Sequence, residues 1–455
     1  MNDFTKGSIT KQIISFSIPM LIGNVFQQLY SMVDAMVVGR YVGSNALAAV
    51  GVAMSILQFL VSVLIGLTTG ASVLISQYYG ARKYDKMKRM VSTSVVFLGM
   101  FSVVVAVAGI LFSPHLLRWL DATPEIMDDA VLYLRFLMGG MLFPVFYNMY
   151  TAYLRALGDS RSPLLILILC TIINTVLDLV FVMQFHMGVL GAAVATLIAQ
   201  AVSAVLCYLY TLHKVPLLHV TSLTFDPKLF TEILKYGTPA AIQLSVVSLA
   251  NLTITKLINS FGAAVMAGIT AAAKIDQLAI MPVSNVSMAL STFVAQNMGA
   301  GQEDRARKGL RFAIVMMVVL AIFISVVLIS LGPWLISMFL NRKDINAGII
   351  AEVGLSYLNI MVIFYFLFAF LFAFNGFFRG VGDSVMAMVF PVASLFVRAV
   401  LAHLLVLFAG MGPEALAWSI PVGWALSSLA AWIYYYKRLW GGKMLVQAGN
   451  IENGN

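Results

Sequence analysis

The sequence predicts an all-α integral membrane protein in which twelve transmembrane helices form two six-helix repeats. Three observations support this fold class: an apolar composition, twelve long apolar runs, and matching segments in the two halves of the chain. Hydrophobic residues make up 61% of the 455 residues and charged residues only 10%, whereas soluble domains average about 25% charged residues. Lipid is therefore the expected solvent for most of the chain, and no polar stretch is long enough to form a soluble domain.

Each apolar run is long enough to cross a bilayer, because a membrane-spanning helix needs about 20 mostly apolar residues. The first run is too long for a signal peptide and no small-residue cleavage site follows it, so we expect it to stay as a helix. The predicted spans are 13–39, 46–76, 91–112, 131–152, 163–183, 189–212, 231–259, 264–296, 312–331, 350–376, 385–409 and 413–436.

Basic residues predict the orientation of these spans. The N-terminus, the even-numbered loops and the C-terminal tail carry 20 Lys and Arg, whereas the odd-numbered loops carry five. The positive-inside rule then places both termini of this multi-pass membrane protein in the cytoplasm. The formal charge of +9 thus reflects topology, and nucleic acid is not expected as a partner.

An internal repeat divides the chain into similar halves. The segment 77–85 recurs as 296–304 at an offset of 219, and Arg155–Ser160 recurs as Arg379–Ser384 at an offset of 224. The Gly-Asp-Ser part of the second pair predicts turns and helix N-caps. A small insertion near residues 340–350 accounts for the change of offset.

The repeat predicts an N-terminal lobe over 1–219 and a C-terminal lobe over 220–455, with six helices each. Because six is even, both halves insert the same way round, and their pseudo-two-fold axis runs along the membrane normal. Parallel repeats of this kind are a transporter architecture, with the site near the middle of the bilayer.

Two carboxylates fall inside predicted spans of the first half, where ionisable groups are functional candidates. Asp34 lies in the first span and Asp178 in the fifth, one turn after Asn174. Thr196 in the sixth span and Tyr133 in the fourth are candidates to complete a polar cluster, although the sequence alone does not bring them together. The first span also has a polar face that we expect to line a cavity, formed by Asn24, Gln27, Ser31 and Asp34.

A buried pair of carboxylates can exchange a small cation. The two groups repel each other and lose hydration, so the pair can take up a proton near neutral pH or hold a metal cation. Either event removes the repulsion and can shift a helix between two packings. The structural alternative is that each Asp is a buried group paired with Asn, Thr or Lys.

The second half does not repeat the acid pair. At the offset of 224, Asn174 corresponds to Arg398 and Asp178 to Ala402. This half has intramembrane charges of its own: Lys256, Lys274, Asp276 and Arg398. They are either a structural ion network or part of a substrate or coupling element that lines the cavity, and Lys256 is a candidate partner of Asp276 across helices.

Motifs for enzymatic chemistry are not found in the sequence. It has no P-loop, so ATP is not expected to drive it. Its five histidines lack metal-ligand spacing, and no hydrolase elbow is present. We therefore expect no catalytic residues, no cofactor and no structural metal.

The chain resembles the multidrug and toxic compound extrusion (MATE) family over nearly its whole length, and four kinds of segment carry the resemblance by their order along the chain. They are Ser31–Arg40 in the first span, the Gln-x-x-Gly-Ala loop of each half, the Arg155–Ser160 segment and Asn174–Asp178 in the fifth span. The resemblance implies a V-shaped pair of six-helix lobes. It also implies export of bulky organic compounds, often cationic or amphiphilic, in antiport with H⁺ or Na⁺.

The resemblance is to the prokaryotic branch typified by DNA-damage-inducible protein F, whose coupling site lies in the N-terminal lobe. It therefore implies a bacterial or archaeal cell membrane as the location. It implies that Asp34, Asn174 and Asp178 hold the ion, with Thr196 and Tyr133 beside them; Na⁺ would bind at Asp34, Asn174, Asp178 and Thr196. Pro19 matches the proline about which the first helix is proposed to bend. Another branch carries a glutamate in the seventh helix, and residues 243–255 have no acid.

Two other transport classes and one passive class are alternatives to the class that this resemblance implies. A major facilitator is disfavoured because residues 80–89 do not fit its loop motif. A lipid-linked precursor flippase of the same wider superfamily stays open, because Lys256, Lys274 and Arg398 would suit a cationic cavity. A channel would not require an acid pair confined to one lobe. A monomer suffices for the expected mechanism.

Overall fold

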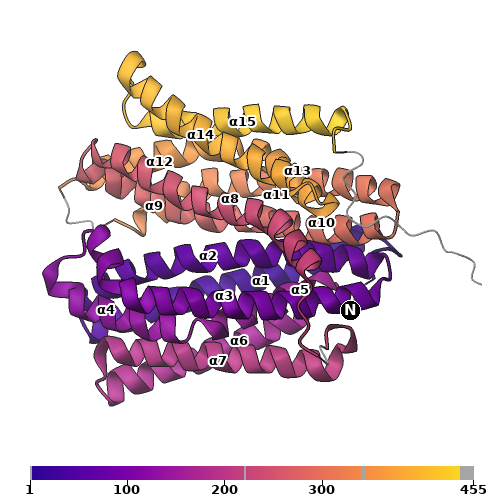
Figure 1. Cartoon of the computed structure of the whole chain (residues 1–455). Helices are drawn as coiled ribbons and strands as arrows, with labels where there is room; N and C mark the ends of the chain where they lie inside the picture. The colour runs from indigo at the N-terminus through magenta and orange to yellow at the C-terminus, as the bar shows by residue number, and fades with distance from the viewer. Residues whose placement is uncertain (1–2, 220–221, 341–344, 441–455) are drawn as a thin grey trace, which may run out of the picture. The chain divides into compact units, whose positions relative to one another are not determined.

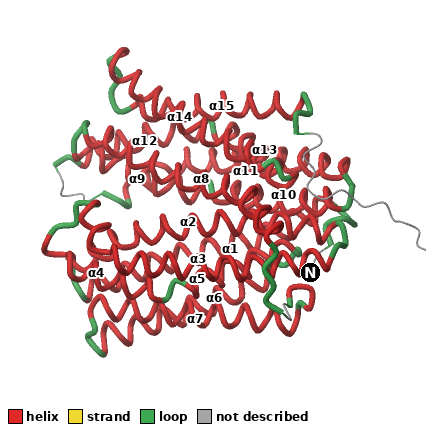
Figure 2. Tube along the Cα trace, viewed as in Figure 1, coloured by secondary structure: helices red, strands yellow, loops and turns green. Residues whose placement is uncertain are grey.

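The computed structural model describes residues 3–219, 222–340 and 345–440, and every regular element in these ranges is helical (Figure 2). The α-helices are α1 (Ile9–Tyr41), α2 (Ser44–Gly80), α3 (Tyr84–Trp119), α4 (Pro124–Gly139), α5 (Leu142–Ala156), α6 (Arg161–Asp178), α7 (Gly188–Lys214), α8 (Pro227–Asn259), α9 (Ala263–Ala279), α10 (Met281–Gly299), α11 (Glu303–Ser337), α12 (Ala347–Ile363), α13 (Tyr365–Val381), α14 (Ser384–Ala409) and α15 (Glu414–Tyr436). A π-helical turn, η1 (Leu179–Gln184), follows α6, and a 3₁₀ turn, η2 (Pro216–Leu218), follows α7.

The described residues contain nine helical spans long and apolar enough to cross a membrane, or eleven when two bent helix pairs are counted. The bent pairs are α4–α5, with a bend of 51°, and α12–α13, with a bend of 54°. These spans confirm a multi-pass helical membrane protein. The predicted span 231–259 falls on α8, which is not among the eleven, so the number twelve stays a prediction.

The break between α4 and α5 requires a residue without a side chain. A Cβ atom at Gly140 would lie 1.7 Å from Leu197 Cδ1 on α7, so any other residue there would clash with α7. Broken helices in membrane proteins need neighbouring groups to satisfy the freed backbone, and α5 is packed between α2 and α7.

The described chain forms two compact units. Of the described residues, unit 1 comprises Asp3, 18–219 and 222–241, and unit 2 comprises 4–17, 242–340 and 345–440. The helices α1 and α8, which are labelled in Figure 1, each contribute one end to each unit. The predicted lobe boundary at residue 219 describes the sequence repeat and stays a prediction.

Within unit 1, α2 packs against α3, α4 and α5, and α7 packs against α5 and α6. Small residues bring α2 against the first part of α8. A Cβ atom at Gly70 would lie 2.3 Å from Gly237 N, and one at Gly66 would lie 2.3 Å from Ala241 Cα. Such small-residue contacts let helix backbones approach closely in lipid, where apolar burial gives little drive to association.

Within unit 2, α10 packs against α11 and α13, and α14 packs against α15. The N-terminal segment is tied to the junction of α10 and α11. Phe4 N donates to Gln296 Oε1 at 3.0 Å, and Asn297 Nδ2 donates to Phe4 O at 3.1 Å. The repeated Gln-x-x-Gly-Ala loop is thus a docking point for the start of the chain in this unit.

Candidate functional site

The two intramembrane acids of the first half lie in one buried cluster of unit 1. Asp34 is near the end of α1 with 5% of its surface exposed, and Asp178 ends α6 with none exposed. Each carboxylate has one oxygen, Oδ1, that no described residue hydrogen bonds. The two carboxylates are close enough to interact electrostatically.

Asn174 holds the second oxygen of Asp178, and Thr196 orients the Asn174 amide. The partners fix the orientation of the Asn174 amide: Nδ2 donates to Asp178 Oδ2 at 2.8 Å, and Oδ1 accepts from Thr196 N at 3.2 Å. Asp178 is followed by the η1 turn, and π-helical segments often mark functional sites. The end of α6 is therefore tied to α7 through one amide side chain.

Two tyrosines complete the cluster. Tyr133 on α4 is fully buried, interacts electrostatically with both acids, and its hydroxyl faces Thr196 without a hydrogen bond of good geometry. Tyr30 on α1 shares a 3.4 Å hydrogen bond with Thr196 Oγ1. Tyr30 was missed in the sequence, although it lies one helical turn before Asp34, on the same side of the helix.

This arrangement can hold a small cation. A buried polar atom without a partner is unfavourable, and here two carboxylate oxygens in one cluster lack donors. A proton would give one acid a hydrogen to donate, and a metal cation would be bound by carboxylate, amide and hydroxyl oxygens, which are hard ligands. The donor set therefore fits H⁺ or Na⁺ on chemical grounds.

The other residues expected on α1 are spread along the helix. Pro19 is buried within α1, Asn24 is half-buried, and Gln27 and Ser31 are exposed, with Ser31 Oγ donating to Gln27 O at 3.1 Å. Their roles as hinge and cavity lining stay predictions.

The charged residues of the second half form a separate network in unit 2. Asp276 on α9 is half-buried and accepts a 2.6 Å hydrogen bond from Tyr365 Oη, at the bend between α12 and α13. Arg398 on α14 donates to Tyr357 Oη at 3.4 Å and interacts electrostatically with Asp276. The sequence pattern singles out the charged residues of this half but not these two tyrosines.

The two lysines of that half are not part of this network as described. Lys274 is exposed on α9. The Lys256 side chain lies outside the described residues, and so does its predicted pairing with Asp276.

The repeated Gly-Asp-Ser segments cap helices, as predicted. Asp159 Oδ1 accepts from Arg161 N and Ser162 N, both at 3.1 Å, and Asp383 Oδ1 accepts from Met386 N at 3.4 Å. A tyrosine from the last helix of each half completes the motif: Tyr210 donates to Asp159 Oδ2 at 3.1 Å, and Tyr434 donates to Asp383 Oδ2 at 2.6 Å. These two tyrosines are also 224 residues apart.

The fold and the buried acids define a multi-pass helical membrane protein with an ionisable interior site. The sequence matches the family described as MatE over residues 19–180 and 239–404. It is 30% identical to the probable multidrug resistance protein YpnP of Bacillus subtilis, over 96% of this chain and 97% of that protein. It is 27% identical to the probable multidrug resistance protein YoeA of the same organism, over 97% of this chain and 96% of that protein.

The chain belongs to the MatE family of membrane transporters. The fold agrees with that of a solved structure, a multidrug resistance MATE family transporter in an outward-facing conformation. The TM-score to it is 0.89 at 22% identity, over 96% of this chain and 97% of that one.

Proposed function

We propose that the protein exports organic compounds, often cationic or amphiphilic, in antiport with H⁺ or Na⁺. The substrate class rests on its relatives, which are described as multidrug resistance proteins. The antiport rests on the chain's own residues. Transport of this kind uses an ion gradient and needs neither ATP nor a bound cofactor.

The observation that carries the proposal is the pair of carboxylate oxygens without donors. Asp34 and Asp178 come from different helices and meet in one cluster with Oδ1 of each unbonded. A stable structural acid is normally satisfied by its neighbours, so this cluster is expected to be satisfied by an ion that comes and goes.

Ion binding can be linked to movement through α1. This helix carries Asp34 near one end, and it contains Pro19 at the point where the chain passes from unit 2 to unit 1. Proline inside a helix removes a backbone hydrogen bond and favours a kink. We propose that filling or emptying the acid cluster changes the bend of α1 at Pro19, which alternates access to the substrate.

The proposed topology has twelve spans in two parallel sets of six, with α8 as the span beyond the eleven counted above. The lobes are 1–219 and 220–455, both termini are cytoplasmic, and the working unit is a monomer. The repeat offsets and the distribution of Lys and Arg support this arrangement.

The test is efflux of a fluorescent organic cation from proteoliposomes, with a proton gradient and a sodium gradient imposed separately. Efflux driven by either gradient supports the antiporter and identifies its ion. Failure with both gradients, across several cations, would overturn the proposal and favour the flippase alternative, for which lipid-linked substrates are then assayed.

A further inference from the structure

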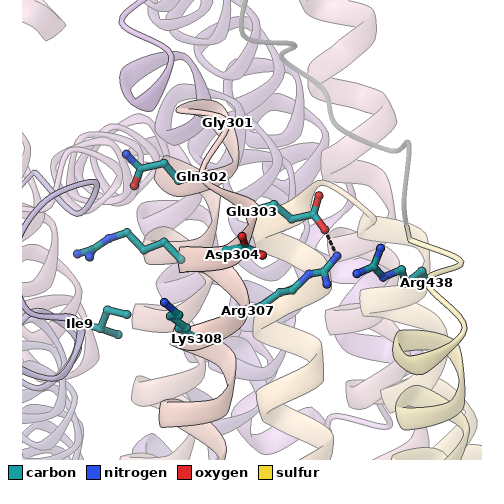
Figure 3. Close-up of a pocket in the computed structure, with 9 residues that line it drawn as sticks. Ile9, Gly301, Gln302, Glu303, Asp304, Arg307, Lys308 and Arg438 are labelled. Carbon is teal, nitrogen blue, oxygen red and sulfur yellow. Dashed lines mark hydrogen bonds and ion pairs between the residues drawn. The ribbon is translucent and has the colours of Figure 1, made fainter.

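A basic cavity of about 670 Å³ lies in unit 2, where the first turns of α11 meet the end of α15 (Figure 3). We propose that this cavity, the headgroup pocket, binds the phosphate group of an anionic phospholipid. Four of its lining residues are cationic and two are acidic. The lining residues are Ile9, Gly301, Gln302, Glu303, Asp304, Arg305, Arg307, Lys308 and Arg438.

One arginine of the pocket is held in place by its neighbours. Arg307 is ion-paired with Glu303 one turn earlier, as the dashed line in Figure 3 marks. Its guanidinium lies 5.4 Å from the centre of the Trp440 ring, and that ring stacks on Tyr435. The guanidinium is fixed between an acid and an aromatic ring. It is therefore a positively charged group with a defined position in the lining of the pocket.

A second arginine joins the N-terminal segment to the same pocket. Arg305 donates to Phe4 O at 3.1 Å, to Gly7 O at 2.8 Å and to Gln12 Oε1 at 2.9 Å. These bonds hold the start of α1 beside α11, and Ile9 becomes an apolar part of the lining.

Lys308 and Arg438 are the cations left to bind a ligand. Both side chains are exposed, and neither has a hydrogen bond or ion pair to any residue in the described ranges. Arg438 has a φ of 51°, a left-handed conformation that is uncommon outside glycine. That turn lets the chain fold back so that Trp440 packs against Arg307, and Figure 3 shows Arg438 beside the Glu303–Arg307 pair.

The pocket lies at the depth expected for lipid headgroups. The helices α11 and α15 are both candidate membrane spans, and the pocket is formed where α11 begins and just beyond the end of α15. On the last turns of α15, Trp432 and Tyr436 are exposed by 49% and 74%. Tryptophan and tyrosine collect at this interface, and basic pockets beside spans bind anionic headgroups.

The simpler explanation is that these cations only set the topology. That explanation needs charge but no defined pocket, and the first half offers a matched pair to test it. Arg89 and Lys214 lie at offsets of 219 and 224 from Lys308 and Arg438, and both are exposed. If topology is the only role, both pairs respond alike.

The experiment is titration of the full-length, detergent-solubilised protein with phosphatidylglycerol, read by native mass spectrometry. The double variant K308Q/R438Q is expected to bind about thirtyfold more weakly, from about 1 kcal/mol for each basic residue near an anionic surface. The matched variant R89Q/K214Q is expected to bind like the parent protein. Equal losses in the two double variants would overturn the proposal.

Two further arms separate the headgroup from other ligands. Asp304 is the acid of the pocket that has no ion pair within the described residues, so D304N should bind phosphatidylglycerol more tightly, an effect that damage to the fold would not produce. Weaker binding by D304N would mean that an ammonium group is recognised instead.

Inorganic phosphate at the same concentration should not compete with phosphatidylglycerol, and full competition would assign the pocket to a soluble phosphate. None of these readouts depends on transport, so the test of the headgroup pocket is independent of the test of the antiport.

Discussion

The two halves of the chain carry different charges at corresponding places. By the repeat offset of 224, Tyr133 corresponds to Tyr357 and Asn174 to Arg398. The first half surrounds these positions with two acids, each with an oxygen that lacks a donor. The second half places a guanidinium there, near a single acid that already accepts a 2.6 Å hydrogen bond.

The difference shows how a duplicated structure can specialise. In the second half the positive charge is part of the Arg398 side chain, so compensation of Asp276 does not depend on a bound ion. In the first half no described cation is close to the acids, and compensation has to come from a bound ion. An ion that can leave allows the site to switch between two states, whereas a covalently attached cation does not.

The largest stability effect is expected where the fixed cation is removed. Arg398→Asn places in the second half the residue found in the first, and it leaves Asp276 without its nearby charge. We expect the free energy of unfolding to fall by about 2 kcal/mol, less than for a fully buried pair because Asp276 is half-buried. Thermal unfolding in detergent measures this. The double variant R398N/D276N should recover most of the loss. An equal loss in the single and double variants would contradict the compensation of Asp276 by Arg398.

A smaller loss is expected from the hydrogen bond at the bend between α12 and α13. Tyr365→Phe removes the 2.6 Å bond to Asp276 and should lower the free energy of unfolding by about 1.5 kcal/mol, near the upper end for polar contacts in membrane proteins. Tyr30→Phe removes only a 3.4 Å bond to Thr196 and should cost about 0.5 kcal/mol or less. A larger loss for Tyr30→Phe in the same unfolding assay would mean that the acid cluster of the first half contributes more to stability than the Asp276 network of the second half, the reverse of what we expect.

The helix caps should respond alike in the two halves. Asp159→Ala and Asp383→Ala each remove a cap and a tyrosine hydrogen bond, and each should lower stability by about 1 kcal/mol. The measurement is again the unfolding temperature, with Asp159→Asn and Asp383→Asn as controls that keep an acceptor oxygen. A clear difference between the two alanine variants would show that the repeated caps have diverged in role.

The smallest stability effect is expected at the acids of the first half. Asp34→Asn and Asp178→Asn remove like-charge repulsion and keep the shape of the side chain, so the unfolding temperature should stay the same or rise slightly. Asp276→Asn is the matched control in the second half and should lower it. Strong destabilisation by Asp178→Asn would indicate a structural acid instead.

Much of the fold followed from composition and periodicity. Apolar runs of about 20 residues have few alternatives to membrane helices, and every predicted span falls on a helix or a helical pair. The breaks were not predicted. At the break before α5, Gly140 leaves room for Leu197 from α7, which would clash with any Cβ atom there. Such a contact is made by distant parts of the chain and leaves no local pattern.

The charged residues of the candidate site were easier to predict from the sequence than the neutral ones. A carboxylate inside an apolar run is conspicuous, so Asp34, Asp178 and Asp276 could be singled out. Tyr30, Tyr357 and Tyr365 were not, because tyrosine is common in membrane helices and only the packing shows that its hydroxyl faces a polar partner. The headgroup pocket likewise depends on α11 meeting the end of α15, which the sequence does not reveal.

The most direct test of the account compares Asp178→Asn with Asp276→Asn in one efflux assay. Both variants are reconstituted at equal protein density, and efflux of a fluorescent organic cation is followed under the gradient that drives the parent protein. The account predicts that Asp178→Asn reduces efflux to the level of protein-free liposomes, while Asp276→Asn retains gradient-driven efflux. Full activity in Asp178→Asn, or loss of coupling in Asp276→Asn alone, would contradict the placement of the ion site in the first half.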